Sequence, residues 1–586
     1  MAMNKTVQLL ITLIWLSTGL FTNSIYSADA TLGKVPETGV MFGSVQGPNN
    51  FIAAKVYAKN LDKNMLYMVY TNKGEYRMPN LMVGAYEIWS EHKELRSEHS
   101  WLRIESNSKV DADFTLKSGP ADPLTLNVRN APQEGNVVSY DELYPPGVGR
   151  DLAERTCMSC HGQMHIPSYK FDKAGWNAMI GLMLDPNARR GAMIQEGSGV
   201  GNITDEERDL LSGYLADNFG PDSVDRVLFS EAEYPLDEAE LSKGLFVEYM
   251  LPLGPNTDLA IRSRAEAGKH RILEPKIDNQ GNIWGTNSFI GVSKLDPRTA
   301  EYSHYPFGID RENGNPYIQA HGMTIDSSDD IFWIEFFGKH VGRLNPETGK
   351  MDRFPMDPEK KVYNIQGHTP DLDSKENVWF TVITGNKMGV WDRQTEKVSL
   401  YEVPTANSFP YGIDVDQQDN VYFAQLFGCK VGVINAITKE FKEYPALASP
   451  CSMNRVMVDK EGIVWYSLNR SGLLGRLDPK TGKQIEYPVL PFREDRTIPL
   501  SSPYGIMADH KNKVWFGDQG LGGALIRFDQ DTEKFAYFPL PRKTDNPNID
   551  ITGKGAIVYT SRSSRQAAIG IFYPDVSQMT SFAVYR

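Results

Sequence analysis

The stretch PYGIDVDQQDNVYFAQ, residues 410–425, has a counterpart further along the chain, PYGIMADHKNKVWFGD, residues 503–518. In both, an Asp is followed six residues later by an aromatic residue, with turn-forming residues between the two. β-Branched and aromatic residues favour strands. A unit that recurs along a chain is typical of repeat architectures, so the two segments predict a repeated β unit.

The same Asp-to-aromatic spacing occurs in further copies, which follow one another at about 45 residues. Each copy continues into a strand with a glycine, such as 341–346, and most close on Tyr-Pro or Phe-Pro, as at 305–306 and 538–539. Four strands per unit at this period indicate propeller blades, and seven copies predict a seven-bladed β-propeller over residues 241–586. The pairs are Asp278–Trp284, Asp326–Phe332, Asp373–Trp379, Asp416–Tyr422, Asp459–Trp465, Asp509–Trp515 and a degraded copy, Thr552–Val558.

Residues 245–250, LFVEYM, precede the first copy and have the pattern of a closing strand without a blade of its own. We expect this strand to complete the last blade and to seal the ring. The sequence of residues 410–425 and that of residues 503–518 resemble the repeats of the streptogramin (virginiamycin B) lyase family of propellers. This resemblance implies the same propeller fold.

Polar residues vary at two places in the repeat. The innermost strand of a blade is expected to begin about five residues before the Asp, and the next strand to end about nine after it, so both places lie on one face near the central channel. His, Glu and Asp on one rim suit a divalent ion or acid–base chemistry. The minus-five residues are His321, His368, Tyr411, Asn454 and Tyr504, and the plus-nine residues include Asn287, Glu335, Gln425 and Asp518.

The lyases of this family use a metal with His and Glu at their channel. The resemblance therefore implies His321, His368 and Glu335 as catalytic candidates, and a divalent metal ion in the propeller as a candidate cofactor. The alternative is that these polar side chains line a water-filled channel and form hydrogen bonds with backbone groups at the ends of the strands.

The pentapeptide Cys157-Met158-Ser159-Cys160-His161 is a C-x-x-C-H motif. Two thiols at this spacing add to the vinyl groups of a haem, and the adjacent His becomes the proximal iron ligand. The alternatives are a zinc site, for which only His165 lies close by as a further ligand, and a thioredoxin-like redox pair, which needs a βαβ surround. The surround here is predicted to be helical, at 147–156, at 172–184 and after the capping box that starts at Thr204.

Short helices around C-x-x-C-H resemble a class I cytochrome c domain, here over residues 146–222. The resemblance implies one covalent haem c held by Cys157, Cys160 and His161. A methionine is expected as the sixth ligand, and thioether ligation of this kind raises the haem potential. Met183 is preferred because Trp176 and Met183 have the spacing seen in related domains, and Met179 and Met193 are the alternatives; Met179 and Met183 packing in the core remains open.

The N-terminal residues 1–30 combine a lysine, a short apolar run and an Ala-x-Ala site, which indicates a secretory signal; an uncleaved anchor is the alternative. Residues 36–119 alternate with period two and predict a small β-sandwich. This part resembles the carboxypeptidase regulatory-like domain, an immunoglobulin-like sandwich. Residues 120–145 and 223–240 are expected to be linkers, and the chain as a whole is expected to be mainly β.

Composition limits the partners. The 586-residue chain has a net charge of -13 and no basic block, which argues against a nucleic-acid partner. No segment after the signal reaches membrane-spanning length, so a periplasmic or secreted protein is expected. Among its four cysteines, Cys429 and Cys451 either form a disulfide or remain two buried thiols.

Three functions fit these features. The first is a haem-linked oxidoreductase that oxidises a small molecule at the propeller and passes electrons through haem c to a redox partner protein. The second is a metal-dependent lyase of the streptogramin-lyase type with an accessory cytochrome. The third is a non-catalytic electron-transfer or binding protein.

Overall fold

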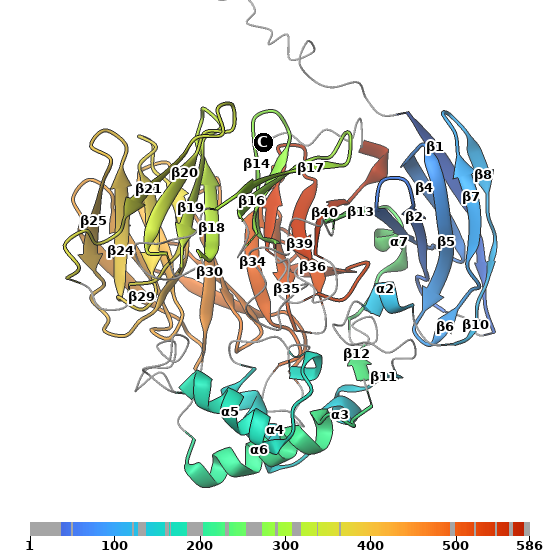
Figure 1. Ribbon diagram of the computed structural model, residues 1–586, viewed down its shortest axis with the longest axis horizontal. Helices are drawn as coiled ribbons and strands as arrows, with labels where there is room; N and C mark the ends of the chain where they lie inside the picture. The colour runs from blue at the N-terminus through green and yellow to red at the C-terminus, as the bar shows by residue number, and fades with distance from the viewer. Residues whose placement is uncertain are drawn as a thin grey trace, which may run out of the picture. The chain divides into compact units, whose positions relative to one another are not determined.

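The computed structural model describes much of the chain after residue 36 (Figure 1). The predicted signal, residues 1–30, lies outside the described residues. Within them, none of the helices combines the length and apolarity that a membrane crossing requires. The described residues are 37–48, 51–119, 122–126, 136–158, 163, 166–184, 203–224, 226–228, 234–252, 272–287, 291–307, 318–336, 338–361, 365–449, 451–492, 499–520, 523–544, 548–561 and 567–578.

Six four-stranded antiparallel sheets follow one another along the C-terminal part of the chain. The first strand of each sheet contacts the first strand of the next, and β14 also contacts β38, so the first strands form a closed ring. This is the architecture of a β-propeller. The sheets are β14 (Ile272–Ile277), β15 (Ile283–Asn287), β16 (Gly291–Asp296) and β17 (Glu301–Pro306); β18 (Ala320–Ile325), β19 (Ile331–Glu335), β20 (His340–Leu344) and β21 (Met351–Pro355); β22 (Gly367–Leu372), β23 (Val378–Val382), β24 (Lys387–Asp392) and β25 (Lys397–Glu402); β26 (Pro410–Val415), β27 (Asn420–Gln425), β28 (Lys430–Asn435) and β29 (Phe441–Pro445); β30 (Met453–Val458), β31 (Val464–Leu468), β32 (Leu473–Leu477) and β33 (Gln484–Pro488); β34 (Pro503–Ala508), β35 (Val514–Asp518), β36 (Ala524–Asp529) and β37 (Lys534–Pro539).

The seventh set of strands is completed from the start of the propeller segment. β38 (Ile549–Ile551), β39 (Ile557–Ser561) and β40 (Ala568–Tyr573) are joined by β13 (Leu245–Met250), which pairs with β40 from Leu245↔Tyr573 to Met250↔Ala568. The prediction that residues 245–250 close the last blade is confirmed. A fully buried ion pair, Arg542 with Glu248 of β13, and a 3.0 Å hydrogen bond from the Tyr559 hydroxyl to Glu248 hold this strand in place.

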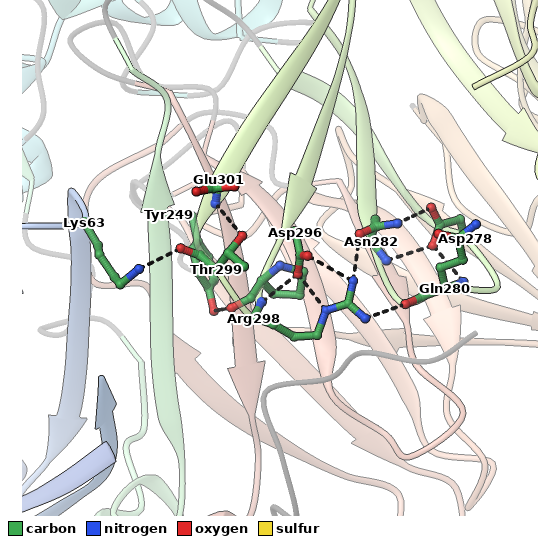
Figure 2. Close-up of polar contacts among 10 residues, drawn as sticks. Lys63, Tyr249, Asp278, Gln280, Asn282, Asp296, Arg298, Thr299 and Glu301 are labelled. Carbon is green, nitrogen blue, oxygen red and sulfur yellow. Dashed lines mark hydrogen bonds and ion pairs between the residues drawn. The ribbon is translucent and has the colours of Figure 1, made fainter. Parts of the chain in front are cut away.

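The repeated Asp explains the six-residue spacing. Asp278 Oδ1 accepts hydrogen bonds from the backbone N–H groups of Gln280 and Asn282, at 3.0 and 2.8 Å, which fixes the turn. Its Oδ2 accepts from the Asn282 side chain and from Nε1 of Trp284, both at 2.8 Å. Figure 2 shows this turn and Arg298, which braces it by bonding Asn282 and the Gln280 carbonyl.

The indole bond recurs wherever the aromatic residue is Trp. It measures 3.0 Å in Asp373–Trp379, 3.0 Å in Asp459–Trp465 and 2.9 Å in Asp509–Trp515. The Phe copy uses another donor, because Arg393 from the next blade bonds Asp326 at 2.6 Å. In the degraded copy, Thr552 Oγ1 accepts from the same two backbone positions. The repeated residue therefore has a structural role, because its side chain fixes the turn between two strands through hydrogen bonds.

The N-terminal β region consists of two sheets that share one apolar core. Its chain crosses between the sheets at a turn where Lys73 and Gly74 have positive φ, 52° and 82°. One sheet is β4 (Glu75–Met82), β1 (Thr38–Gln46) and β8 (Lys109–Asp111) with β9 (Phe114–Thr115); the other is β10 (Lys117–Ser118), β6 (Leu95–Arg96), β5 (Gly84–His92), β2 (Lys55–Asn60) and β3 (Met65–Tyr70) with β7 (Ser100–Ile104).

The second sheet continues into the propeller. β3 pairs with the free edge of β13, from Phe246↔Met68 to Tyr249↔Met65, so ten strands form one sheet. Side chains reinforce the junction, since Tyr70 and Tyr57 donate to the carbonyls of Pro539 and Pro541 at 2.8 and 2.9 Å. Lys63 donates to the Thr299 carbonyl at 2.9 Å (Figure 2).

The three helices predicted around the C-x-x-C-H motif are present: α4 (Val148–Thr156), α5 (Lys173–Leu184) and α6 (Asp205–Phe219) (Figure 1). Thr204 and Glu207 form the predicted capping box. α4 and α6 approach closely, because a Cβ on Gly149 would lie 2.3 Å from Tyr214. The predicted linkers also contain elements: α2 (Pro123–Leu126), β11 (Asn136–Val138) and α3 (Tyr140–Leu143) in the first, β12 (Arg226–Leu228) and α7 (Glu238–Leu241, which begins there) in the second; β11 and β12 pair in parallel.

Two matched substitutions test the indole bond. Asp373→Asn keeps an oxygen for the backbone donors but turns an N–H toward Trp379, whereas Asp416→Asn makes the same change in a blade whose aromatic residue is Tyr422. We expect Asp373→Asn to lower the free energy of unfolding by about 1–3 kcal/mol more than Asp416→Asn, measured by urea unfolding. Equal effects would show that the indole bond contributes nothing.

Candidate functional site

The innermost strands of six blades share an irregularity. In each of β14, β18, β22, β26, β30 and β34 the register with the second strand shifts near its start, as between Ala320 and Met323 or between Gly367 and Pro370. Such a bulge breaks the alternation of side chains and redirects them. Consecutive residues near the start of these strands therefore both contribute to the centre of the ring.

Four minus-five residues gather at this centre. The rings of His321 and His368 lie 3.7 Å apart, and the rings of His368 and Tyr411 lie 3.9 Å apart. The hydroxyls of Tyr411 and Tyr504 are 2.9 Å from each other. The side chains come from β18, β22, β26 and β34, so rings from four different blades contact one another in sequence. The prediction that His321 and His368 lie together is confirmed.

A buried ion pair completes this group. Arg455 of β30 donates to Glu274 of β14 at 2.5 Å, and each side chain is 8% exposed. Arg455 also donates to Thr369 at 3.0 Å, and its guanidinium lies 5.6 and 5.1 Å from the ring centres of Tyr411 and Tyr504. Burial opposes the charge of Arg455, but Glu274 and the two tyrosines outweigh it and raise the pKa of Arg455. Glu274, His321, His368, Tyr411, Arg455 and Tyr504 are called the central cluster below.

The central cluster combines a matched pair of charges with neutral proton donors and acceptors. Glu274 also faces His321, with 3.9 Å between its Oε1 and the Nδ1 of the ring. His368 Nδ1 lies 2.7 Å from the Thr369 hydroxyl. Two imidazoles, two phenols and one guanidinium in one small region can hold a polar organic molecule and exchange protons with it.

Glu335 lies apart from the histidines with which it was grouped. Its carboxylate accepts from Arg353 of β21, at 2.8 Å from Nε and 2.6 Å from a terminal nitrogen, and lies 3.6 Å from His340 of β20. The bulge affects only the innermost strand, so the second strand keeps its alternation and turns Glu335 toward the outer strands of its own blade. Gln425 likewise bonds Glu443 of the outer strand β29. Asp518 instead accepts from the backbone N–H groups of Ser502 and Gly520.

The sequence analysis did not predict Glu274 and Arg455, because each lies four residues before the repeated Asp and not five. In a regular strand, that position would face away from its minus-five neighbour. The only sequence signal is that a charged residue stands where other blades have Gly322, Gly412 and Gly505.

Of the predicted haem-binding residues, the side chain of Cys157 is described. It lies at the C-terminal end of α4, half-buried against an apolar cluster that includes Leu152, Trp176 and Leu211. Burial raises the pKa of the Cys157 thiol. Cys160, His161 and Met193 lie outside the described residues. Met183 belongs to α5, but its side chain also lies outside them, while Met179 is half-buried on the same helix.

Cys429 and Cys451 form a disulfide between the turn that joins β27 to β28 and the segment that leads into β30. Of the two arrangements considered from the sequence, the crosslinked one is therefore present. Disulfides persist in oxidising compartments, so the crosslink indicates an extracytoplasmic protein. As for metals, no three His, Cys, Asp or Glu side chains are placed to share an ion in the part of the chain that the structure describes.

Comparisons with known proteins relate the propeller to solved structures. No family model matches the chain, and no curated protein does. A streptogramin B lyase structure is 18% identical and covers 56% of this chain and 97% of its own, with a TM-score of 0.46. Virginiamycin B lyase from Staphylococcus aureus is 17% identical over 52% and 95%, with a TM-score of 0.45. The WD40 propeller domain of Doa1 is 12% identical over 53% and 96%, with a TM-score of 0.39.

The central ion pair yields a stability prediction. Glu274→Ala leaves Arg455 buried without its carboxylate, and we expect the free energy of unfolding to fall by about 3–5 kcal/mol. Glu301→Ala, on the exposed outer strand β17 of the same blade, is the control and should change it by less than about 0.5 kcal/mol. Both are measured by urea unfolding, and a loss below 1 kcal/mol for Glu274→Ala would contradict the central role of this pair.

Proposed function

We propose that this protein is an extracytoplasmic c-type cytochrome in which a small molecule is oxidised at the central cluster and electrons leave through a covalent haem. The observation that carries the proposal is the setting of Cys157. Its thiol lies where α4 ends, against the apolar core of three helices whose limits match those expected around a haem motif. An apolar helical surround of this kind suits a porphyrin.

The haem would be held by Cys157 and Cys160, with His161 as proximal ligand and Met183 as the preferred sixth ligand. When bound, it would accept one electron at a time and pass it to a partner protein. The chain's own contribution is an apolar surround. Trp176, on the face of α5 that carries Ile180, is buried, and its indole donates to the Phe219 carbonyl at 3.3 Å.

Contacts between the helices and the propeller support a connection between the two sites. Gln163, two residues beyond the motif, donates to the carbonyls of Pro499 and Leu500 at 3.2 and 3.3 Å. These residues lead directly into β34, which carries Tyr504 of the central cluster. Tyr234, which follows α6 in the sequence, donates to Asp518 of β35 at 2.8 Å. The motif is thus anchored on the segment that enters the central cluster.

The central cluster supplies what an oxidation needs on the substrate side. Removing electrons from an organic molecule releases protons, and the imidazoles of His321 and His368 can act as proton acceptors. Arg455 would position an oxygen of the substrate. We also assign the propeller to the streptogramin-lyase type with seven blades, and the N-terminal β region to the carboxypeptidase regulatory-like type, on the sequence patterns that suggested both.

A visible spectrum tests the haem. Protein exported from a host that matures c-type cytochromes should show the sharp α-band of reduced haem c, and the pigment should survive denaturation because it is covalent. Cys157→Ala and Cys160→Ala should each abolish double thioether attachment, and Met183→Ala should shift the reduction potential. Cys429→Ser with Cys451→Ser is the control and should keep the pigment. Colourless wild-type protein would refute the proposal.

The adjacency of His321 and His368 favours one second candidate, a metal-dependent lyase of the streptogramin type. Isothermal titration with Zn²⁺ should then show a site that is lost in His321→Ala and in His368→Ala. His304→Ala is the matched control, because His304 lies on the outer strand β17 beside Ser293. Absence of binding in the wild type would exclude this candidate. If the same His variants also left substrate-driven haem reduction unchanged, a non-catalytic electron-transfer role would remain.

A further inference from the structure

A second layer of charged residues lies beyond the central cluster on the innermost strands. It occupies the minus-two position of the repeat, and its side chains are partly exposed although the strands around them are buried. The charged members come from four different blades, and the other blades contribute Thr324, Met457 and Met507 at the same position. The charged members are Lys276 of β14, Asp371 of β22, Asp414 of β26 and Asp550 of β38.

Two of these carboxyl groups are neighbours. Asp371 bonds the backbone N–H of Val415, the residue that directly follows Asp414, so the two acidic side chains lie beside each other. Two carboxylates this close repel each other, which favours a proton on one of them. The backbone fixes both groups in place: Asp371 Oδ2 accepts from the N–H of Val415 at 2.9 Å, and Asp414 Oδ2 accepts from that of Val458 at 2.6 Å.

Each of these bonds crosses to the next blade, because Asp371 belongs to the third blade and Val415 to the fourth, while Asp414 belongs to the fourth and Val458 to the fifth. The two carboxyl groups therefore cannot separate without breaking contacts between blades. Their closeness is a property of the ring, and no single blade could produce it.

The surrounding charges favour one proton on the pair. Burial raises the pKa of Asp414, and the neighbouring Asp371 raises it further. Burial also raises the pKa of Asp371, against the opposing effect of Lys276. Burial opposes the charge of Lys276, but Asp550, Asp371, Glu274 and Asp414 outweigh it, so the pKa of Lys276 is raised. Lys276 lowers the pKa of both carboxyl groups, but burial outweighs this effect at each of them.

We propose that Asp371 and Asp414 hold one proton between them at neutral pH, mainly on Asp414, and form an acid–base pair of the ring centre. Asp371 follows His368 by three residues on β22, and Asp414 follows Tyr411 by three on β26. Three residues of strand span about 10 Å. At this separation the pair does not contact the central cluster directly, and protons would pass between the two through intervening water.

The pair has the chemistry of two carboxyl groups that share a proton, an arrangement that gives one group the role of acid and the other of base. It would serve reactions that release or consume a proton on a molecule held at the central cluster. The inference rests on the contacts of the second layer alone, and it stands or falls independently of haem and of any bound metal.

Infrared difference spectroscopy of the full chain tests the proposal. At pH 7 the wild type should show the carbonyl stretch of a protonated carboxyl group, with the isotope shift expected in D₂O. Asp414→Asn should lose the part of this band that Asp414 contributes while keeping an N–H donor toward Asp371, so the fold should persist. Glu91, whose pKa burial raises to about 7, contributes to the band in both proteins. Asp550→Asn is the matched control and should keep the band. No protonated band in the wild type, or a band of undiminished intensity in Asp414→Asn, would overturn the proposal.

Two further measurements follow from the same pair. In Asp371→Asn the like charge next to Asp414 is gone, so the band should disappear at a lower pH than in the wild type. A raised pKa in the folded state stabilises the fold at low pH, and this contribution is lost as the pH rises through the folded-state pKa. Asp414→Asn should therefore unfold at a higher temperature than the wild type above neutral pH, with the difference shrinking toward pH 4. An advantage that is independent of pH would contradict the shared proton.

Discussion

Six propeller blades depend on one carboxylate at the turn between their two inner strands, and in the seventh set of strands the hydroxyl of Thr552 takes its place. The Asp side chain accepts hydrogen bonds from two backbone N–H groups of that turn. Where the residue six positions after the Asp is Trp, it also accepts one from the indole N–H. One oxygen therefore sets the turn, and the other fixes the first large side chain of the next strand. Because this connection aligns the innermost strand with its neighbour, the places where side chains reach the ring centre follow from it.

The features that could be predicted are those that rest on local hydrogen bonding or periodicity. Asp459 and Trp465 identify a blade from the sequence, because their bond joins residues six apart. Thr204 and Glu207 identify the start of α6 for the same reason. The closing strand 245–250 could be predicted because its apolar pattern lacked neighbours of its own. These expectations needed no knowledge of contacts between distant segments.

The site was predicted only in part, because it depends on contacts between blades. His321 and His368 were grouped correctly from their common register, since both stand at minus five. Glu335 was grouped with them on a regular strand geometry, but its partner Arg353 lies on an outer strand of the same blade. Glu274 was overlooked because a bulge, which no local pattern announced, turns minus-four residues inward as well. The one sequence signal for it was a charged residue at a repeat position where other blades have glycine.

The ten-stranded sheet has a consequence for how the molecule is made. β13 is synthesised before all the blades, whereas its partner β40 belongs to the last of them, so the ring stays open until almost the whole chain is available. An unpaired strand edge invites association with other chains. β3 is already present when β13 emerges and pairs with its other edge. Pairing with β3 thus holds β13 in a sheet with one edge covered, so that only the edge that will receive β40 stays open until the last blade is made.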